Sequence, residues 1–271
     1  MTDLPKLIDS KLEISDRVAM LVLDRDDVRN ALTGTALIDD IVRTIDWING
    51  GAAVSVLVLT GAGKAFSAGG NVKDMRDRRG SFAGDVFEVQ DRYRCGIQRI
   101  AQAMHRLEVP AIAAVNGAAI GAGFDLATMC DIRIAADDAV FGSTFINLGI
   151  VPGNGGAWLL QDLIGPQRAA ELIFTGRLVR AEEAVRLGIA LEIAAASQLQ
   201  AQALQLAATI AGKPPQALRL AKRLLMAAQR LDLPDYLDLC AVFQGMCHNT
   251  LDHLEVVEAF LDKRPALFQG R

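Results

Sequence analysis

The sequence predicts an α/β fold in which a strand-containing first half is followed by a helical C-terminal segment. Two short apolar runs, Val54 to Gly61 ("VSVLVLTG") and Ala111 to Val115 ("AIAAV"), have the length and composition of buried strands. Stretches with apolar residues at helical spacing lie before and between them, and from Asn154 onward only helical patterns follow. Strands that alternate with helices at this spacing favour an α/β arrangement with right-handed crossovers.

The first half begins with a predicted β-hairpin. Residues 12–23 contain two strand-like pieces, "LEIS" and "VAMLVL", and the polar step Asp16-Arg17 between them suits a turn. A glycine-rich loop follows the strand at 54–61 and leads towards a long amphipathic helix. The other elements expected before residue 150 are helices at 35–48 and 85–107 and strands at 111–115, 131–136 and 139–142.

Prolines punctuate the helical second half. Pro214, Pro215, Pro234 and Pro265 lie at the borders of segments with helical spacing, where helices often begin or end. The expected helices are 154–163, 166–174, 181–187, 197–211, 214–230 and two more between 233 and 263.

Composition describes a globular chain with a large apolar core. Of 271 residues, 51% are hydrophobic and 22% charged, and the net charge of -4 makes a general nucleic-acid binder improbable. Four cysteines without a CxxC pair and three scattered histidines do not fit a zinc site and favour a reduced, cytoplasmic setting. The N-terminal residues lack a signal-peptide pattern, and polar residues and glycines interrupt the longest apolar run, so no membrane span is expected.

One aspartate stands out. Asp125 is the only formally charged residue between Pro110 and Cys130, just after three glycines in an apolar run. A carboxyl group in apolar surroundings has a raised pKa and can serve as a general acid or base. The alternative is that Asp125 only interacts with the dipole of the helix that begins there.

Two glycine-rich loops each link a predicted strand to a predicted helix. They are Gly61 to Met75 ("GAGKAFSAGGNVKDM") and Ala114 to Ala127 ("AVNGAAIGAGFDLA"). Loops of this kind can present main-chain N–H groups to an anion or to a developing oxyanion.

Three common glycine motifs do not fit these loops. "GAGFDL" lacks the third glycine of a dinucleotide fingerprint, and "GAGK" has Val58 where a phosphate loop needs its first glycine. "AFSAG" lacks the glycine that a nucleophile elbow needs before Ser67. Nucleotide-cofactor and serine-hydrolase chemistry are therefore disfavoured.

Five segments in order resemble the crotonase (enoyl-CoA hydratase/isomerase) superfamily. They are "LDRDDVRNAL", "GAGKAFSAGGNVKDM", "VPAIAAVNGAAIGAGFDLATMCDIRIA", "FINLGIVPGNGG" and "EAFLDKRPALF", which together span nearly the whole chain. The resemblance implies a spiral of repeated ββα units over residues 1–200, carrying a site for an acyl-CoA thioester. It also implies a helical trimerisation region over 201–271, trimers often paired into hexamers, and no cofactor beyond the coenzyme A of the substrate.

The resemblance also assigns roles to residues. Main-chain N–H groups at Ser67 and Ala122 would hold the thioester oxygen as it becomes an enolate, with Asp125 as the acid or base. Contacts to coenzyme A or to the acyl group are implied for Arg25, Arg29, Ala65, Ser67, Ala68, Gly69, Asn71, Val72, Gly121 and Phe145. Phe260 and Lys263 are expected from a neighbouring subunit.

The chain departs from the family pattern at the acids. Hydratases of the family carry two glutamates that orient water, and the corresponding positions here are Asp125 and Phe145. Dienoyl-CoA isomerases share the aspartate but add acids at the positions of Phe145 and Gly153. A single carboxyl group can still transfer a proton, so hydration and double-bond isomerisation both remain open. Another CoA-thioester reaction (decarboxylation, hydrolysis or ring formation) and CoA binding with little catalysis are the alternatives.

Overall fold

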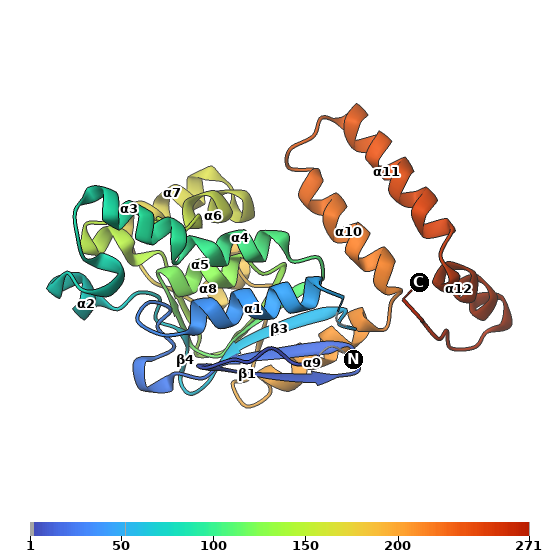
Figure 1. The fold of residues 1–271 in the computed structure, drawn as a ribbon, viewed down its shortest axis with the longest axis horizontal. Helices are drawn as coiled ribbons and strands as arrows, with labels where there is room; N and C mark the ends of the chain where they lie inside the picture. The colour runs from blue at the N-terminus through green and yellow to red at the C-terminus, as the bar shows by residue number, and fades with distance from the viewer. Residues whose placement is uncertain (1–2, 52, 271) are drawn as a thin grey trace.

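The computed structural model describes residues 3–51 and 53–270, and its core is built on two β-sheets (Figure 1). The larger sheet begins with the predicted hairpin, whose turn residues Asp16 and Arg17 have φ angles of 47° and 65°. Positive φ at both central residues matches the twist of a two-residue hairpin. The strands, in sheet order, are β1 (Ser10–Ser15), β2 (Val18–Leu23), β3 (Val56–Gly61), β5 (Ala111–Val115), β7 (Ile132–Ala136) and β10 (Glu192–Ala194).

From β2 to β10 neighbouring strands of this sheet are parallel. Parallel sheets are covered on both faces, and β3 and β5 are accordingly buried along their whole length. This explains why both read as continuous apolar runs rather than as alternating patterns. Helix α9 (Leu199–Ala211) packs against β2, β3, β5 and β7.

The second sheet consists of short strands in the order β4 (Ala65–Ser67), β6 (Ala118–Ile120), β8 (Val140–Gly142) and β9 (Val179–Arg180). Three times in succession the chain adds one strand to each sheet: β3 then β4, β5 then β6, and β7 then β8. A helix follows each pair, so the expected spiral of ββα units is confirmed. The helices before the C-terminal region are α1 (Leu37–Asn49), α2 (Val72–Asp77), α3 (Val86–Cys95), α4 (Gln98–Arg106), α5 (Ala122–Thr128), α6 (Gly156–Ile164), α7 (Pro166–Thr175), α8 (Ala181–Leu187) and α9.

The prediction of a single long helix over 85–107 was wrong. The chain forms α3 and α4 with a break at Gly96, whose φ and ψ of -111° and -109° are not helical. A Cβ atom at Gly96 would lie 2.4 Å from the carbonyl oxygen of Arg92, so the break depends on glycine. The capping box of Asp85 and Glu88 starts α3 as a separate helix.

Three C-terminal helices form an arm that extends away from the core (Figure 1). They are α10 (Pro215–Ala227), α11 (Leu233–His248) and α12 (Leu251–Asp262). The arm exposes many large apolar side chains, among them Leu237, Val242, Leu254, Phe260 and Leu261. A division at residue 200 remains a prediction. Helix α9, which would follow that division, packs on the large sheet, and the arm begins only at α10.

Candidate active site

The two glycine-rich loops lie against each other at one end of the small sheet. Strands β4 and β6 are parallel neighbours, so both loops leave the sheet at the same edge. A Cβ atom on Gly69 would lie 2.8 Å from the Ala122 nitrogen, and one on Gly123 would lie 2.1 Å from the Ser67 carbonyl oxygen. Only glycine allows the two main chains to come this close.

Both loops line one small cavity of about 30 Å³. That volume holds about one water molecule, so an acyl chain can enter only if flexible side chains such as Met75 move. Gly70 borders the cavity from the first loop and Ala122 from the second. The lining is completed by Thr33, Met75, Ser81, Phe82, Arg92, Tyr93, Ile97, Phe145, Ile150 and Asn154.

The main-chain N–H groups around this cavity are not equally available. The N–H of Ala68 donates to the Arg29 carbonyl oxygen at 2.9 Å, and that of Gly69 donates to Ser67 Oγ at 3.1 Å. Among the hydrogen bonds of the described residues, none uses the N–H of Gly70 or of Ala122. The N–H groups of the two residues that border the cavity are therefore unoccupied.

Three residues of the first loop region do not border the cavity: Ala65 and Ser67, which belong to β4, and Ala68. Ser67 is fully buried in β4 and does not line the cavity. Its hydroxyl donates to the Asn30 carbonyl oxygen at 2.7 Å while accepting the Gly69 N–H. Ala65 is also buried in β4. The structure thus brings Ala122 to the cavity as expected, but with Gly70 rather than Ser67 opposite it.

Asn30 is a buried residue that the sequence analysis did not single out. Its Nδ2 donates to the carbonyl oxygens of Ala62 at 2.9 Å and Ala65 at 2.8 Å, and its Oδ1 accepts the Arg25 N–H at 2.9 Å. Asn30 therefore fixes the first glycine loop to the segment after β2. The sequence around Asn30 gives no sign of this role, because the acceptors of its Nδ2 group are main-chain atoms more than thirty residues away.

The two arginines expected to contact coenzyme A, Arg25 and Arg29, differ in their partners and in their accessibility. Arg25 pairs with Asp27 at 2.8 Å and with Asp9 at 3.2 Å, and these partners raise the pKa of its guanidinium group. Arg29 is exposed in a left-handed conformation with φ of 54°. Arg29 is thus accessible to a ligand, whereas Arg25 is already engaged by two carboxylates.

The remaining predicted contact residues have diverse positions. Asn71 caps α2, accepting the Lys73 N–H at 3.0 Å, while its own N–H donates to Thr33 Oγ1 at 2.9 Å. Val72 is 51% exposed in the first turn of α2. Phe260 and Lys263 lie at the exposed end of α12, on the arm rather than at the cavity of their own chain.

Asp125 lies on α5, one turn after Ala122, and is 2% exposed. Burial raises the pKa of its carboxyl group to about 8, although a hydrogen bond with the Asn154 side chain lowers it in part. Its Oδ2 has no hydrogen-bond partner among the described residues. Asp125 itself does not line the cavity, but Asn154 does, so the carboxyl group lies directly behind the wall.

Phe145 and Gly153 are the positions at which the family resemblance predicts acids. Phe145 lines the cavity from the 3-10 helix Thr144–Leu148, near Gly121, which has φ of 54°. A Cβ atom at Gly153 would lie 2.9 Å from the Tyr93 ring. An acid at position 153 would therefore require Tyr93 to move, and the cavity lining of the described residues contains no carboxylate.

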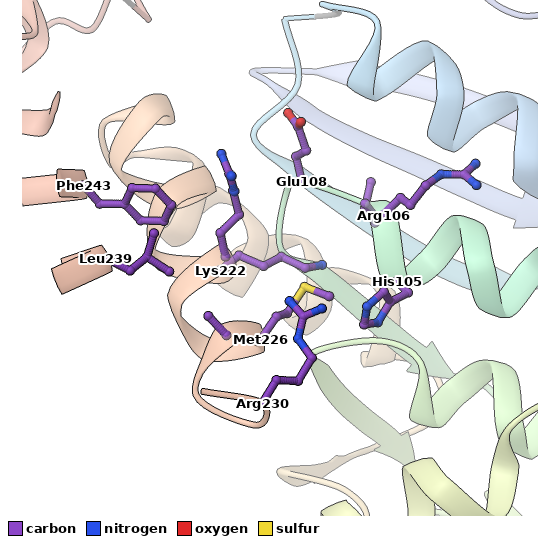
Figure 2. A pocket seen from close by; sticks show the side chains of 11 residues that line it. His105, Arg106, Glu108, Lys222, Met226, Arg230, Leu239 and Phe243 are labelled. Atoms are coloured by element: carbon purple, nitrogen blue, oxygen red, sulfur yellow. The ribbon is translucent and has the colours of Figure 1, made fainter. Parts of the chain in front are cut away.

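A larger cavity of about 440 Å³ lies where the arm joins the core (Figure 2). Lys222 of α10 enters this junction and binds Asp131 Oδ2 and the Val109 carbonyl oxygen, both at 2.8 Å. Met226 and Arg230 face His105 of α4 across the cavity. Neither glycine loop contributes to this lining, so the larger cavity is separate from the candidate active site.

Within residues 3–51 and 53–270, no group of three or more histidine, cysteine or acidic side chains is arranged to hold a metal ion. In the same residues no helix is long and apolar enough to cross a bilayer. The four cysteines are free thiols.

Comparison with known proteins decides the family. A sequence model described as enoyl-CoA hydratase/isomerase matches residues 13–271. The chain belongs to the enoyl-CoA hydratase/isomerase family. This enoyl-CoA hydratase/isomerase family member is 34% identical over 258 residues to the crotonyl-CoA hydratase of Syntrophomonas wolfei, covering 95% of the chain and 96% of the relative.

Other relatives of this family agree over similar lengths. The 2,3-dehydroadipyl-CoA hydratase of Escherichia coli is 33% identical over 255 residues, which is 94% of this chain and 96% of the relative. The solved structure of the enoyl-CoA hydratase from Bacillus anthracis superposes with a TM-score of 0.90 at 33% identity, covering 97% of this chain and all of that one. The family's spiral fold and helical C-terminal region are thus those of this chain, and the protein is an enzyme of the enoyl-CoA hydratase/isomerase type that acts on acyl-CoA.

Proposed function

We propose that the main-chain N–H groups of Gly70 and Ala122 bind the thioester oxygen of an enoyl-CoA and stabilise the enolate that forms during the reaction. The observation that carries this proposal is that both residues border one cavity with N–H groups free of protein partners. Fixed donors of this kind contribute about 3 kcal/mol each to transition-state stabilisation. This assignment replaces Ser67 by Gly70 and keeps Ala122.

We propose Asp125 as the group that exchanges a proton with the acyl chain. A pKa of about 8 leaves the carboxyl group mostly protonated at neutral pH but able to ionise, which suits a group that must both give and take a proton. The unpaired Oδ2 atom provides the site for that proton. Access requires Asn154, which lies between Asp125 and the cavity, to shift when substrate enters.

With one carboxyl group, the best-supported reaction is a shift of the double bond between the 3,4 and 2,3 positions of an enoyl-CoA. The ionised acid would take a proton from C2 and return it to C4, while the two N–H donors hold the intermediate dienolate. Hydration of a 2-enoyl-CoA is the second candidate, because the Syntrophomonas wolfei and Escherichia coli relatives are named as hydratases.

Turnover of chain-matched substrates separates the two candidates. An isomerase converts 3-hexenoyl-CoA into the conjugated 2-enoyl thioester, with a rise in its ultraviolet absorbance. In heavy water, C4 gains deuterium to the extent that the proton on Asp125 exchanges with solvent before it is returned. A hydratase instead consumes 2-hexenoyl-CoA and forms the 3-hydroxy product. The absence of both reactions over a range of chain lengths would refute the proposed function.

We further propose that the arm mediates a homotrimer, alone or paired as a hexamer, in the cytoplasm. The exposed apolar side chains of α11 and α12 support burial against other subunits. In such an assembly Phe260 and Lys263 could complete the coenzyme A site of a neighbour, together with Arg29 of that neighbour. Light scattering at several protein concentrations tests the oligomeric state.

A further inference from the structure

Arg92 brings an unpaired positive charge to the candidate active site. Its side chain lines the cavity, and one guanidinium nitrogen donates to the Ala83 carbonyl oxygen. Arg76 and Arg94, which belong to the same stretch of chain, each lie within 4.0 Å of an aspartate. Among the described residues Arg92 has no carboxylate partner within that distance.

Phe82 lies near both Gly70 and Arg92 in the cavity lining. The tip of the Phe82 ring is 3.8 Å from the place that a Cβ atom of Gly70 would occupy. Arg92 instead contacts Ala83, which adjoins the main chain of Phe82. Gly70 therefore lies near the tip of the Phe82 ring, whereas Arg92 contacts the main chain of the residue that follows Phe82. An acyl tail that ran along this ring from a thioester at Gly70 would reach the guanidinium group.

No side chain of the cavity lining balances the charge of Arg92. The cavity lining contains apolar and aromatic residues and the neutral polar side chains of Thr33, Ser81, Tyr93 and Asn154, but no carboxylate. A partly buried guanidinium group is costly without an anionic partner, and its fork geometry matches a carboxylate with two parallel hydrogen bonds.

We propose that the acyl group accepted by this enzyme ends in a carboxylate, which pairs with Arg92 at the far end of the cavity. The substrate class is therefore a short-chain dicarboxylic monothioester of coenzyme A. This inference rests on the proposed function, because the thioester must occupy the Gly70–Ala122 end for the tail to reach Arg92.

Binding of saturated thioesters tests the inference without any turnover. Calorimetry would compare glutaryl-CoA with valeryl-CoA and adipyl-CoA with hexanoyl-CoA, pairs that match in chain length and differ in the terminal carboxylate. We expect at least one carboxylate-terminated ligand to bind about tenfold more tightly than its neutral counterpart, as for one charge-assisted contact. Equal or weaker binding of both carboxylate ligands would overturn the proposal.

Two variants identify the group responsible. Arg92→Gln should remove the tenfold preference, while Arg92→Lys should retain part of it because the charge remains. Arg94→Gln, on the same helix but outside the cavity, is the charge-matched control and should leave the preference unchanged. A preference that survives in folded Arg92→Gln protein would also overturn the proposal, as would equal weakening of the charged and neutral ligands.

Failure of this inference and failure of the proposed function give different results. A carboxylate preference that depends on Arg92, in a protein that neither isomerises nor hydrates any enoyl-CoA, would support the binding role and refute the reaction. Turnover of neutral enoyl-CoA without any carboxylate preference would support the reaction and refute the role of Arg92. Circular dichroism of each variant establishes that it is folded, and the wild-type ligand comparison remains decisive if Arg92→Gln does not fold.

Discussion

The Gly70–Ala122 end of the cavity is built from main chain, whereas the Phe82–Arg92 end is built from side chains on short helices. At the first end, the close approach of Gly69 and Gly123 to the opposite loop holds the two backbones in van der Waals contact. At the second end, α2, α3 and the 3-10 helix Gly80–Phe82 between them contain no buried residue. Elements with little burial open at low free-energy cost. The difference indicates that the reaction geometry is rigid while the acyl end can adapt.

The largest effect is expected at the acid. Asp125→Asn removes the proton carrier but keeps shape and hydrogen bonding, so turnover should fall by about 10²–10⁴-fold with acyl-CoA affinity close to unchanged. Steady-state kinetics on the best enoyl-CoA substrate and calorimetry with a saturated acyl-CoA measure the two quantities. Retained turnover in the variant would exclude Asp125 from proton transfer.

A slightly smaller loss is expected from removing a main-chain donor. Ala122→Pro deletes the N–H group at the first position of α5, where proline is tolerated by a helix. Turnover should fall by about 10²–10³-fold. Ala122→Ser keeps the donor and serves as the control, and similar rates in folded proline and serine variants would contradict the role of this N–H group.

The free energy of unfolding should respond differently to glycine substitutions at the two ends of the cavity. Gly123→Ala places a methyl group 2.1 Å from the Ser67 carbonyl oxygen and should lower the free energy of unfolding by about 1–3 kcal/mol. Gly80→Ala, at the other end, meets no atom within 4 Å and carries only the strain of a φ of 55°, about 1 kcal/mol. Urea unfolding measures both. A larger loss in Gly80→Ala would reverse the comparison.

The pH dependence of stability reports the burial of Asp125. An unfolded chain releases this proton near the ordinary pKa of 3.8, while the folded protein holds it until about pH 8. Between these values the unfolded state binds fewer protons, so this group lowers the free energy of unfolding by about 1.4 kcal/mol per pH unit as pH rises. Asp125→Asn should remove that contribution. Parallel pH profiles of wild type and variant would show that the carboxyl group ionises normally in the fold.

The smallest effect is expected from adding an acid. Phe145→Glu puts a second carboxyl group into the cavity wall and should increase hydration of 2-enoyl-CoA, on the order of tenfold, because the new group is not held by supporting contacts. Phe145→Gln has a similar shape without the acid and is the control. No gain in the glutamate variant would mean that this position does not approach the attacking water.

Sequence patterns predicted the long buried elements but missed most of the short ones. Strands β3 and β5 are continuous apolar runs and were expected at almost their observed bounds. Strands β4, β6, β9 and β10 have only two or three residues, too few for any periodicity, and were not expected as strands. The equally short β8 was expected, at 139–142. The break at Gly96 was missed because the residues on both sides continue a helical pattern.

Some residues of the candidate site could likewise be predicted from the sequence, and others could not. Asp125 and Ala122 could be selected because charge, glycines and family resemblance mark them in the sequence. Gly70 could not be distinguished from Ser67, because the choice depends on which N–H groups are already used by Arg29 and by the Ser67 hydroxyl. Nothing in the sequence marked Arg92 as a site residue, because its place at the cavity depends on where α3 ends and on its contact with Ala83.

Main-chain donors have a consequence for how such a protein changes over generations. Nearly any codon substitution at position 70 or 122 leaves an amide hydrogen in place, and proline alone removes it. Substitutions within residues 75–97 can therefore change which acyl group is preferred, while the main-chain donors that activate the thioester remain. A lineage that starts from this scaffold can acquire new specificities without first losing its chemistry.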